Sequence, residues 1–175
     1  ISELFSIAFF GFGNPDLGPE KARSYELGLR TRKMGDFSGN VSVFHIDLQN
    51  EILFDPIVFM NRNVGKSRRN GIEFSTKYKP VDAVEAFFTY TYTKANLRSS
   101  LLGTSAYQSG DDIGLVPRNR FTAGFNITPF EWLRLHIDGI YTGEQHSQSF
   151  EALSTEARAI DSMIKGYFVA NGRLS

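Results

Sequence analysis

Apolar and polar residues alternate along most of this chain, with the period of two that β-strands show when their two faces meet different environments. The segment VEAFFTYTYTKA (84–95) is typical: Ala, Phe or Tyr at one set of alternate positions faces Glu or Thr at most of the others. Helical periodicity is nearly absent, so the pattern predicts an all-β protein. About seven strands are expected, at 23–33, 37–54, 64–79, 84–95, 118–128, 132–142 and 167–175.

Two of these segments are irregular. In 37–54 the apolar residues change parity: Val41 and Val43 belong to one face, whereas Phe44, Ile46 and Leu48 belong to the other. Such a switch indicates either a β-bulge or a change in what the strand faces. The last segment, YFVANGRLS, gives no pattern from which its two faces can be assigned.

The lengths of strands and connections favour a membrane barrel. Strands of ten or more residues are long for a soluble sandwich but match a tilted strand that crosses a bilayer. Short turns at 33–36, 80–82 and 129–131 alternate with long connections at 55–63, 96–117 and 143–166. Outer-membrane barrels sort their connections in this way. The chain is therefore predicted to be an incomplete segment of a transmembrane, antiparallel, up-and-down β-barrel.

The chemistry of the two predicted faces agrees with that fold. One face is aliphatic and aromatic, as lipid requires, and the other mixes charged and hydroxyl side chains, as a wet lumen allows. A cation in the middle of the lipid face costs about 2–4 kcal/mol. We therefore expect the charged residues within the strands to point into the lumen or to lie near a rim; they are Arg30, Arg32, Glu73, Lys77 and Arg134.

The composition narrows the classes of protein to which this chain can belong. The chain has 175 residues, a formal net charge of zero and no cysteine, so it is long enough for one domain but offers no disulfide or thiolate site. The neutral balance argues against a nucleic-acid partner. Its uncharged apolar runs are too short for a membrane helix. Without an initiator Met or a leader pattern, the chain resembles an internal segment of a longer protein.

Candidate catalytic and metal motifs are weak. His136 with Asp138, and His45 with Asp47, are two residues apart on a strand, which separates neighbouring positions on one face by about 7 Å. We expect both pairs to be lumen-facing polar residues. The GDD sequence at 110–112 offers carboxylates for calcium, but two carboxylates in a long exposed loop are more often solvated. The sequence thus predicts no catalytic residue, metal or cofactor, and no enzyme.

Four stretches together resemble the TonB-dependent outer-membrane receptors. The strongest is NPDLGPEKARSYELGLR (14–30), with an Asn-Pro, a Pro-Glu and a Tyr-Glu-Leu-Gly before a barrel strand. Its prolines would stiffen the loop, and Glu20 could accept bonds from backbone amides. The other three are ELF (3–5), NVGKSRRNGIEFSTKYKP (63–80) and VPRNRFTAGFNITP (116–129), in the same order as in the family.

The resemblance implies a barrel of about 22 strands, closed by an N-terminal plug domain. Residues 1–175 would then be one partial barrel domain, without the plug and without at least two terminal strands. It also implies a receptor in the outer membrane of a Gram-negative bacterium, in contact with lipid. Such a receptor imports a scarce, bulky nutrient, most commonly a ferric siderophore, with energy supplied through TonB by regions outside this chain.

Substrate specificity would lie in the long loops. Candidate ligand contacts there are Phe59, Arg62, Tyr107 and Arg158. A basic group near the start of the third strand could attract an anionic ferric complex or lipopolysaccharide phosphates, or could simply be solvated; it comprises Arg62, Lys66, Arg68 and Arg69. The alternatives are a passive porin-like channel, an outer-membrane barrel enzyme such as a lipase, and a soluble β-sandwich of binding type.

Overall fold

The computed structural model describes residues 7–8, 11–55, 58–101, 108–147 and 163–175. The regular secondary structure of these residues consists of strands. No helix in the described residues is long and apolar enough to cross a membrane. The strands are β1 (Ile7–Ala8), β2 (Gly11–Phe12), β3 (Lys21–Met34), β4 (Phe37–Asp55), β5 (Met60–Val81), β6 (Val84–Ser100), β7 (Asn119–Phe130), β8 (Leu133–Thr142), β9 (Gln145–His146), β10 (Met163–Ile164) and β11 (Tyr167–Leu174).

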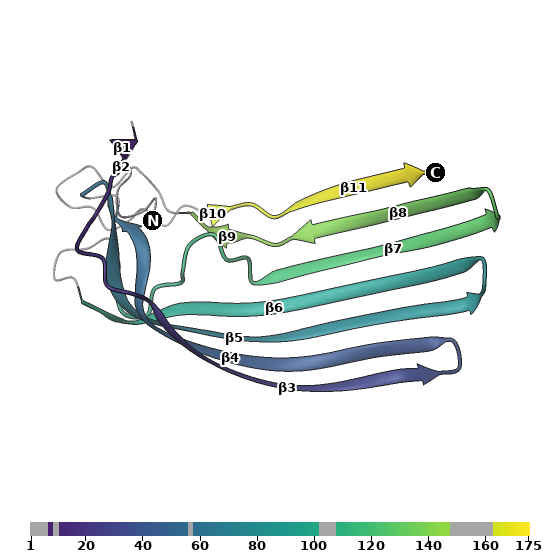
Figure 1. Ribbon diagram of the computed structural model, residues 1–175, viewed down its shortest axis with the longest axis horizontal. Coiled ribbons are helices and arrows are strands. Elements are labelled where there is room, and N and C mark those ends of the chain that lie inside the picture. Colours follow the sequence, from purple (N-terminus) through teal and green to yellow (C-terminus); the bar gives the residue numbers. More distant parts are fainter. Residues whose placement is uncertain (1–6, 9–10, 56–57, 102–107, 148–162) are drawn as a thin grey trace.

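The seven long strands form one antiparallel meander, in the order β3-β4-β5-β6-β7-β8-β11. Figure 1 shows that the tight reversals β3–β4, β5–β6 and β7–β8 gather at one end of the sheet, which we call the turn end. The opposite ends of the same strands lie together at the other end of the sheet, the loop end. The seven predicted strands and the segregation of connections are thus confirmed, and the arrangement is that of a partial barrel wall.

One predicted connection is wrong. Residues 55–63 are not a long loop, because β4 and β5 remain paired as far as Asp55 opposite Met60. Only 56–59 connect them, so the two strands form a hairpin that extends well beyond the neighbouring β3 pairing. The polar sequence at 61–63 suggested a loop because Asn is rare in strands. Here tertiary hydrogen bonds to Asn61 and Asn63 override that preference.

The parity switch in β4 reflects a change of environment. The pairing of β4 with β3 and with β5 is continuous through Gly39–Gln49, so the switch at Val43 and Phe44 involves no bulge. Instead, the Phe44 ring lies over Gly71 on the facing strand, where an added Cβ would come within 2.3 Å of that ring. Gly71 is the glycine of the Asn-Gly-Ile-Glu motif, and its lack of a side chain makes room for Phe44.

A bulge does occur further along β4, at Asn50. The register shifts on both sides of Glu51, and Asn50 has a φ of 58°, a left-handed conformation that Asn tolerates better than most residues. Gly65 lies opposite Glu51 with a φ of 138°, and a Cβ there would meet the Ser99 carbonyl oxygen at 1.9 Å. The bulge turns the outer part of the hairpin so that Glu51, like Arg69, which it contacts, belongs to the polar face.

Cross-strand register assigns the two faces of the whole sheet, including β11, which the sequence pattern left open. The apolar face carries continuous rows of side chains, and Phe168 and Leu174 of β11 join it opposite Tyr141 and Leu135. One row runs across all seven long strands as Leu29, Val41, Phe74, Tyr90, Phe121, Tyr141 and Phe168. The polar face carries the intervening residues.

The Pro-bracketed segment before β3 is fixed to the extended hairpin by side-chain amides. Asn63 accepts a bond from the Gly18 amide (2.7 Å) and donates to the carbonyl oxygens of Gly18 (2.9 Å) and Asn50 (2.8 Å). Asn14 donates to the Asn61 carbonyl oxygen at 2.9 Å. Glu20 accepts from the Ile52 amide at 2.6 Å, which confirms the acceptor role predicted for it. We call these contacts the asparagine clamp.

Gly71→Ala should destabilise the full-length protein by about 1–3 kcal/mol, because the new methyl group overlaps both the Phe44 ring and the Tyr92 carbonyl oxygen. Denaturant unfolding in detergent, followed by circular dichroism, measures the change. Gly172→Ala is the matched control, since a Cβ at Gly172 meets nothing within 4 Å. Equal stability of the two variants would contradict the packing described for Gly71.

Asn63→Ala should release segment 14–20, because it removes all three hydrogen bonds that the Asn63 side chain makes in the clamp. Hydrogen exchange of this segment in the full-length protein should show an opening free energy about 2–3 kcal/mol lower. Asn61→Ala is the control, because Asn61 takes part through its backbone carbonyl. Unchanged exchange in Asn63→Ala would refute the clamp.

Candidate functional site at the loop end

The loop end of the polar face contains a small apolar cluster of buried residues. Val64 and Leu97 are fully buried, and Ala95 and Ile113 nearly so. Two strands and one connection contribute to it: Val64 lies in β5, Ala95 and Leu97 lie in β6, and Ile113 comes from the long segment after β6. The Ile113 amide bonds the Ala95 carbonyl oxygen at 3.0 Å. The cluster therefore anchors a long loop onto the rim of the sheet.

Two ion pairs lie on the hairpin beside this cluster. Arg69 donates to Glu51 at 2.5 Å, and Arg62 donates to Asp55 at 3.2 Å. The carboxylates are buried, with exposed fractions of 3% and 0%, whereas the arginine side chains are 24% and 30% exposed. Buried charges are tolerated when paired in this way. The buried carboxylates thus hold two partly exposed guanidinium groups in fixed positions on the hairpin.

Two of the four predicted ligand contacts can be placed. Phe59 and Arg62 lie at the tip of the hairpin, where Phe59 has a φ of 54° and its ring meets Phe54 edge-on at 6.2 Å. Tyr107 and Arg158 lie outside the described residues. Because Arg62 is paired with Asp55, its charge already has a partner within the chain. The role of all four residues in ligand binding stays a prediction.

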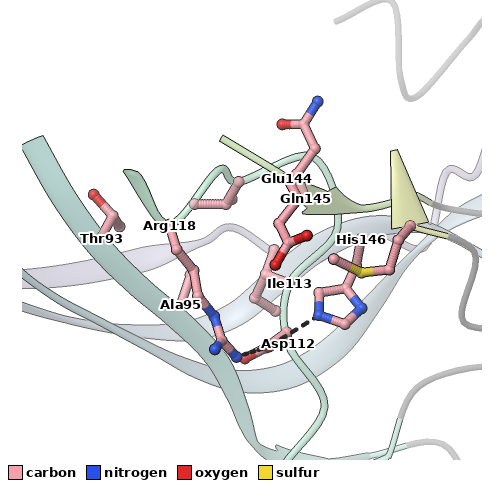
Figure 2. Close-up of a pocket in the computed structure, with 10 residues that line it drawn as sticks. Thr93, Ala95, Asp112, Ile113, Arg118, Glu144, Gln145 and His146 are labelled. Carbon is pink, nitrogen blue, oxygen red and sulfur yellow. Dashed lines mark hydrogen bonds and ion pairs between the residues drawn. The ribbon is translucent and has the colours of Figure 1, made fainter. Parts of the chain in front are cut away.

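A small pocket opens between β6, the segment before β7 and the β9–β10 pair (Figure 2). At its centre the Asp112 carboxylate contacts both the Arg118 guanidinium and, at 3.1 Å, the His146 ring. The hydrogen bond and charge of Asp112 raise the pKa of Arg118. Thr93, Ala95, Ile113, Val116, Glu144, Gln145 and Met163 complete the lining.

The GDD sequence therefore has a structural role that sequence reasoning missed. Asp112 contacts the Arg118 guanidinium and the His146 ring, and Asp111 accepts a bond from the Gln108 amide at 2.7 Å, which closes the local turn. Within the described residues no cluster of three or more His, Cys, Asp or Glu side chains is arranged to hold a metal ion. Arg118, the first arginine of the VPRNR stretch, was the signal that could have indicated a partner for Asp112.

The distance expected between His136 and Asp138 is wrong for their side-chain atoms. The His136 Nε2 and an Asp138 carboxylate oxygen are 2.9 Å apart, because both side chains lean along the strand toward each other. His136 Nδ1 contacts the Asn126 amide oxygen at 2.6 Å, and the ring stacks on Phe87 at 5.7 Å. Both ring nitrogens are thus engaged in a polar network on the polar face, as the sequence predicted for that face.

The expectation for His45 and Asp47 is wrong about their face as well as about the distance between their side chains, because these residues do not belong to the polar face. His45 pairs with Tyr25, and their rings are 6.3 Å apart. Tyr25 shares its face with Leu27 and Leu29, so His45 and Asp47 extend the apolar face toward the loop end. Their side chains contact each other at 3.0 Å.

The predicted basic group is likewise divided between the faces. Arg62 and Arg69 form the buried pairs on the polar face. Lys66 and Arg68 lie opposite Gln49 and Asp47, on the same side as His45. Sequence proximity placed these cations together, but the alternation of the strand and the bulge at Gly65 separate them.

Several solved structures with the same fold are receptors for siderophores or ferric complexes. The siderophore receptor PirA from Acinetobacter baumannii matches with a TM-score of 0.68 and 18% identity, over 93% of this chain and 26% of that structure. The ferric yersiniabactin uptake receptor FyuA from Yersinia pestis gives 0.67 and 17%, over 89% and 22%. The ferric-catecholate import receptor Fiu from E. coli K12 gives 0.64 and 23%, over 97% and 24%.

These likenesses establish the fold of a barrel segment, and the chain spans about a quarter of the length of each structure. The family is established by the sequence itself. All of residues 1–175 match the model of the TonB dependent receptor-like β-barrel. The chain therefore belongs to the TonB-dependent receptor family and forms part of its β-barrel.

Proposed function

We propose that this chain is part of the wall of an outer-membrane receptor that imports a ferric siderophore, with energy supplied through TonB. The observation that carries the proposal is the match of the whole chain to the family's barrel, together with a sheet that has one apolar and one polar face. The similar solved structures are receptors for ferric catecholate, ferric yersiniabactin and other siderophores.

The dimensions of the apolar face support a position in the membrane. On β6 the apolar positions run from Val84 to Tyr92, and the facing part of β5 runs from Ile72 to Val81. Nine or ten residues of a tilted strand rise by roughly 25 Å, which is the height of the apolar band in outer-membrane barrels. We infer that the turn end faces the periplasm and the loop end faces the cell exterior.

The loop end supplies the surface that an incoming ligand meets first. The extended β4–β5 hairpin carries Phe59 and Arg62, and we propose that these act with Tyr107 and Arg158 in ligand recognition. The Arg62 guanidinium suits the negative charge of many ferric complexes, and an aromatic ring such as that of Phe59 can stack on the planar rings of a catecholate ligand. The polar face below them would line the lumen. In the family a plug domain fills that lumen, and the plug and the TonB-contacting segment would be supplied by regions outside this chain.

The polar network on the sheet argues for transport rather than catalysis. His136 is held between Asn126 and Asp138, and Asp138 in turn accepts a bond from Asn171 at 2.9 Å. In the described part of the chain neither His136 nor Asp138 forms a hydrogen bond with a serine, so the pair does not activate a serine nucleophile there. We propose that the network aligns β7, β8 and β11 and that the chain has no enzymatic role.

Uptake of iron-55 by cells tests the proposed function. A strain without its own siderophore receptors, expressing the full-length protein, should accumulate iron from at least one complex in a panel of ferric catecholate, ferric yersiniabactin and ferric citrate. Accumulation should be lost when TonB is deleted, because the family couples import to TonB. TonB-independent leakage of small solutes would instead indicate a passive channel, and no accumulation from a broad panel would refute siderophore import.

Ala123→Arg tests which face meets lipid. Ala123 lies in the middle row of the apolar face, opposite Phe88 and Gly139, so an arginine there should destabilise the full-length protein by about 2–4 kcal/mol. Urea unfolding in lipid vesicles measures the effect. Thr122→Arg, one residue away on the polar face, is the matched control and should cost less than about 1 kcal/mol. Equal costs would contradict the orientation.

A further inference from the structure

Beyond the apolar band, toward the loop end, the same face of the sheet becomes basic. The last apolar row is Leu27, Val43, Ile72 and Tyr92. The three rows that follow it on strands β3 to β6 contain Tyr25, His45, Asn70 and Lys94, then Arg23, Asp47, Arg68 and Asn96, then Lys21, Gln49 and Lys66.

These rows contain five cations and a single carboxylate, in a chain whose formal net charge is zero. Asp47 is bound by Arg68 at 2.8 Å and by His45 at 3.0 Å. The other four cations are exposed and pair with no carboxylate in the described part of the chain. We call this group the outer basic patch; it consists of Lys21, Arg23, Lys66, Arg68 and Lys94.

The geometry of the patch suits a polyanion with fixed charges. Neighbouring strands are about 4.8 Å apart, so cations on alternate strands, such as Lys21 and Lys66, lie roughly 10 Å from each other. Arg68 is already oriented by Asp47 through its Nε, which leaves its terminal nitrogens available as donors. Unscreened like charges at this spacing repel each other, and an anionic group bound between them offsets the repulsion.

We propose that the outer basic patch binds the phosphate groups of lipopolysaccharide in the outer leaflet. The inference rests on the orientation given under the proposed function, which puts the patch in the three rows directly above the lipid-facing band, at the depth of lipid headgroups. Lipopolysaccharide carries phosphates on its glucosamine headgroup at that depth, and its acyl chains would lie against the apolar rows below. Each cation near an anionic lipid surface contributes about 1 kcal/mol.

The imported ligand is a poorer occupant of this patch. A ferric complex must reach the lumen, which the polar face lines, whereas the patch lies on the opposite side of the same strands. Of the basic group at the start of β5, the two cations that belong to the polar face, Arg62 and Arg69, are paired with Asp55 and Glu51. The two basic groups therefore differ in face, in partners and in the anion that can approach them.

The test compares lipid binding by the full-length protein and by the triple variant Lys21→Gln, Lys66→Gln and Lys94→Gln. Native mass spectrometry in detergent, with added deep-rough lipopolysaccharide, measures the affinity for individual lipid molecules. The variant should bind at least about tenfold more weakly, because three of the five cations are lost. The wild-type affinity should fall as sodium chloride rises.

Arg30→Gln with Arg32→Gln is the matched control, because both arginines are exposed on β3 but lie nearer the turn end. This double variant should bind lipopolysaccharide like the wild type. Equal binding by the triple variant would overturn the proposal, as would equal affinity for enzymatically dephosphorylated lipopolysaccharide or full competition by phosphatidylglycerol. Binding of the ferric complexes to the same preparations is measured in parallel, so failure of the transport proposal is seen separately.

Discussion

The lateral pairing of backbone groups is the constraint on which the rest of this structure depends. A strand with an apolar outer face can satisfy its amides and carbonyls only through neighbouring strands. The long strands here do so in one unbroken meander, and the pairing fixes the register of each strand. Because side chains alternate with a period of two, the register also determines the face of every residue. The apolar rows and the polar network follow from this one constraint.

The loop end shows how the constraint is relaxed where the sheet leaves the apolar band. The bulge at Asn50 and the strained position of Gly65 rotate the outer hairpin, so that Glu51 and Asp55 become buried beside Arg69 and Arg62. The asparagine clamp then ties the segment before β3 to that hairpin. The family motif at 14–20 is thereby explained physically: its polar groups complete the hydrogen bonding of an extended hairpin that has no neighbouring β3 residues to pair with.

Much of this could be predicted from residue patterns, and the failures have specific causes. The strands and the short turns follow from alternation and from Gly and Pro chemistry, which are local. The hairpin tip at 60–63 was mistaken for a loop because the partners of its asparagines are distant in sequence. His45 was assigned to the wrong face because, beyond the apolar band, the apolar face itself becomes polar. Asp112 was seen as a possible ion ligand, since its partners Arg118 and His146 come from other segments.

The sequence by itself determined the all-β class, the family and the positions of the short turns, because each depends on contacts or motifs within a few residues. Only the tertiary structure decided how the charged side chains are divided between the two faces of the sheet. Arg62, Lys66, Arg68 and Arg69 form one cluster in the sequence but two groups in space, one paired with buried carboxylates and one outward on the opposite face. The physical reason is that a strand directs successive side chains to opposite faces, and a single bulge changes which face receives each of them.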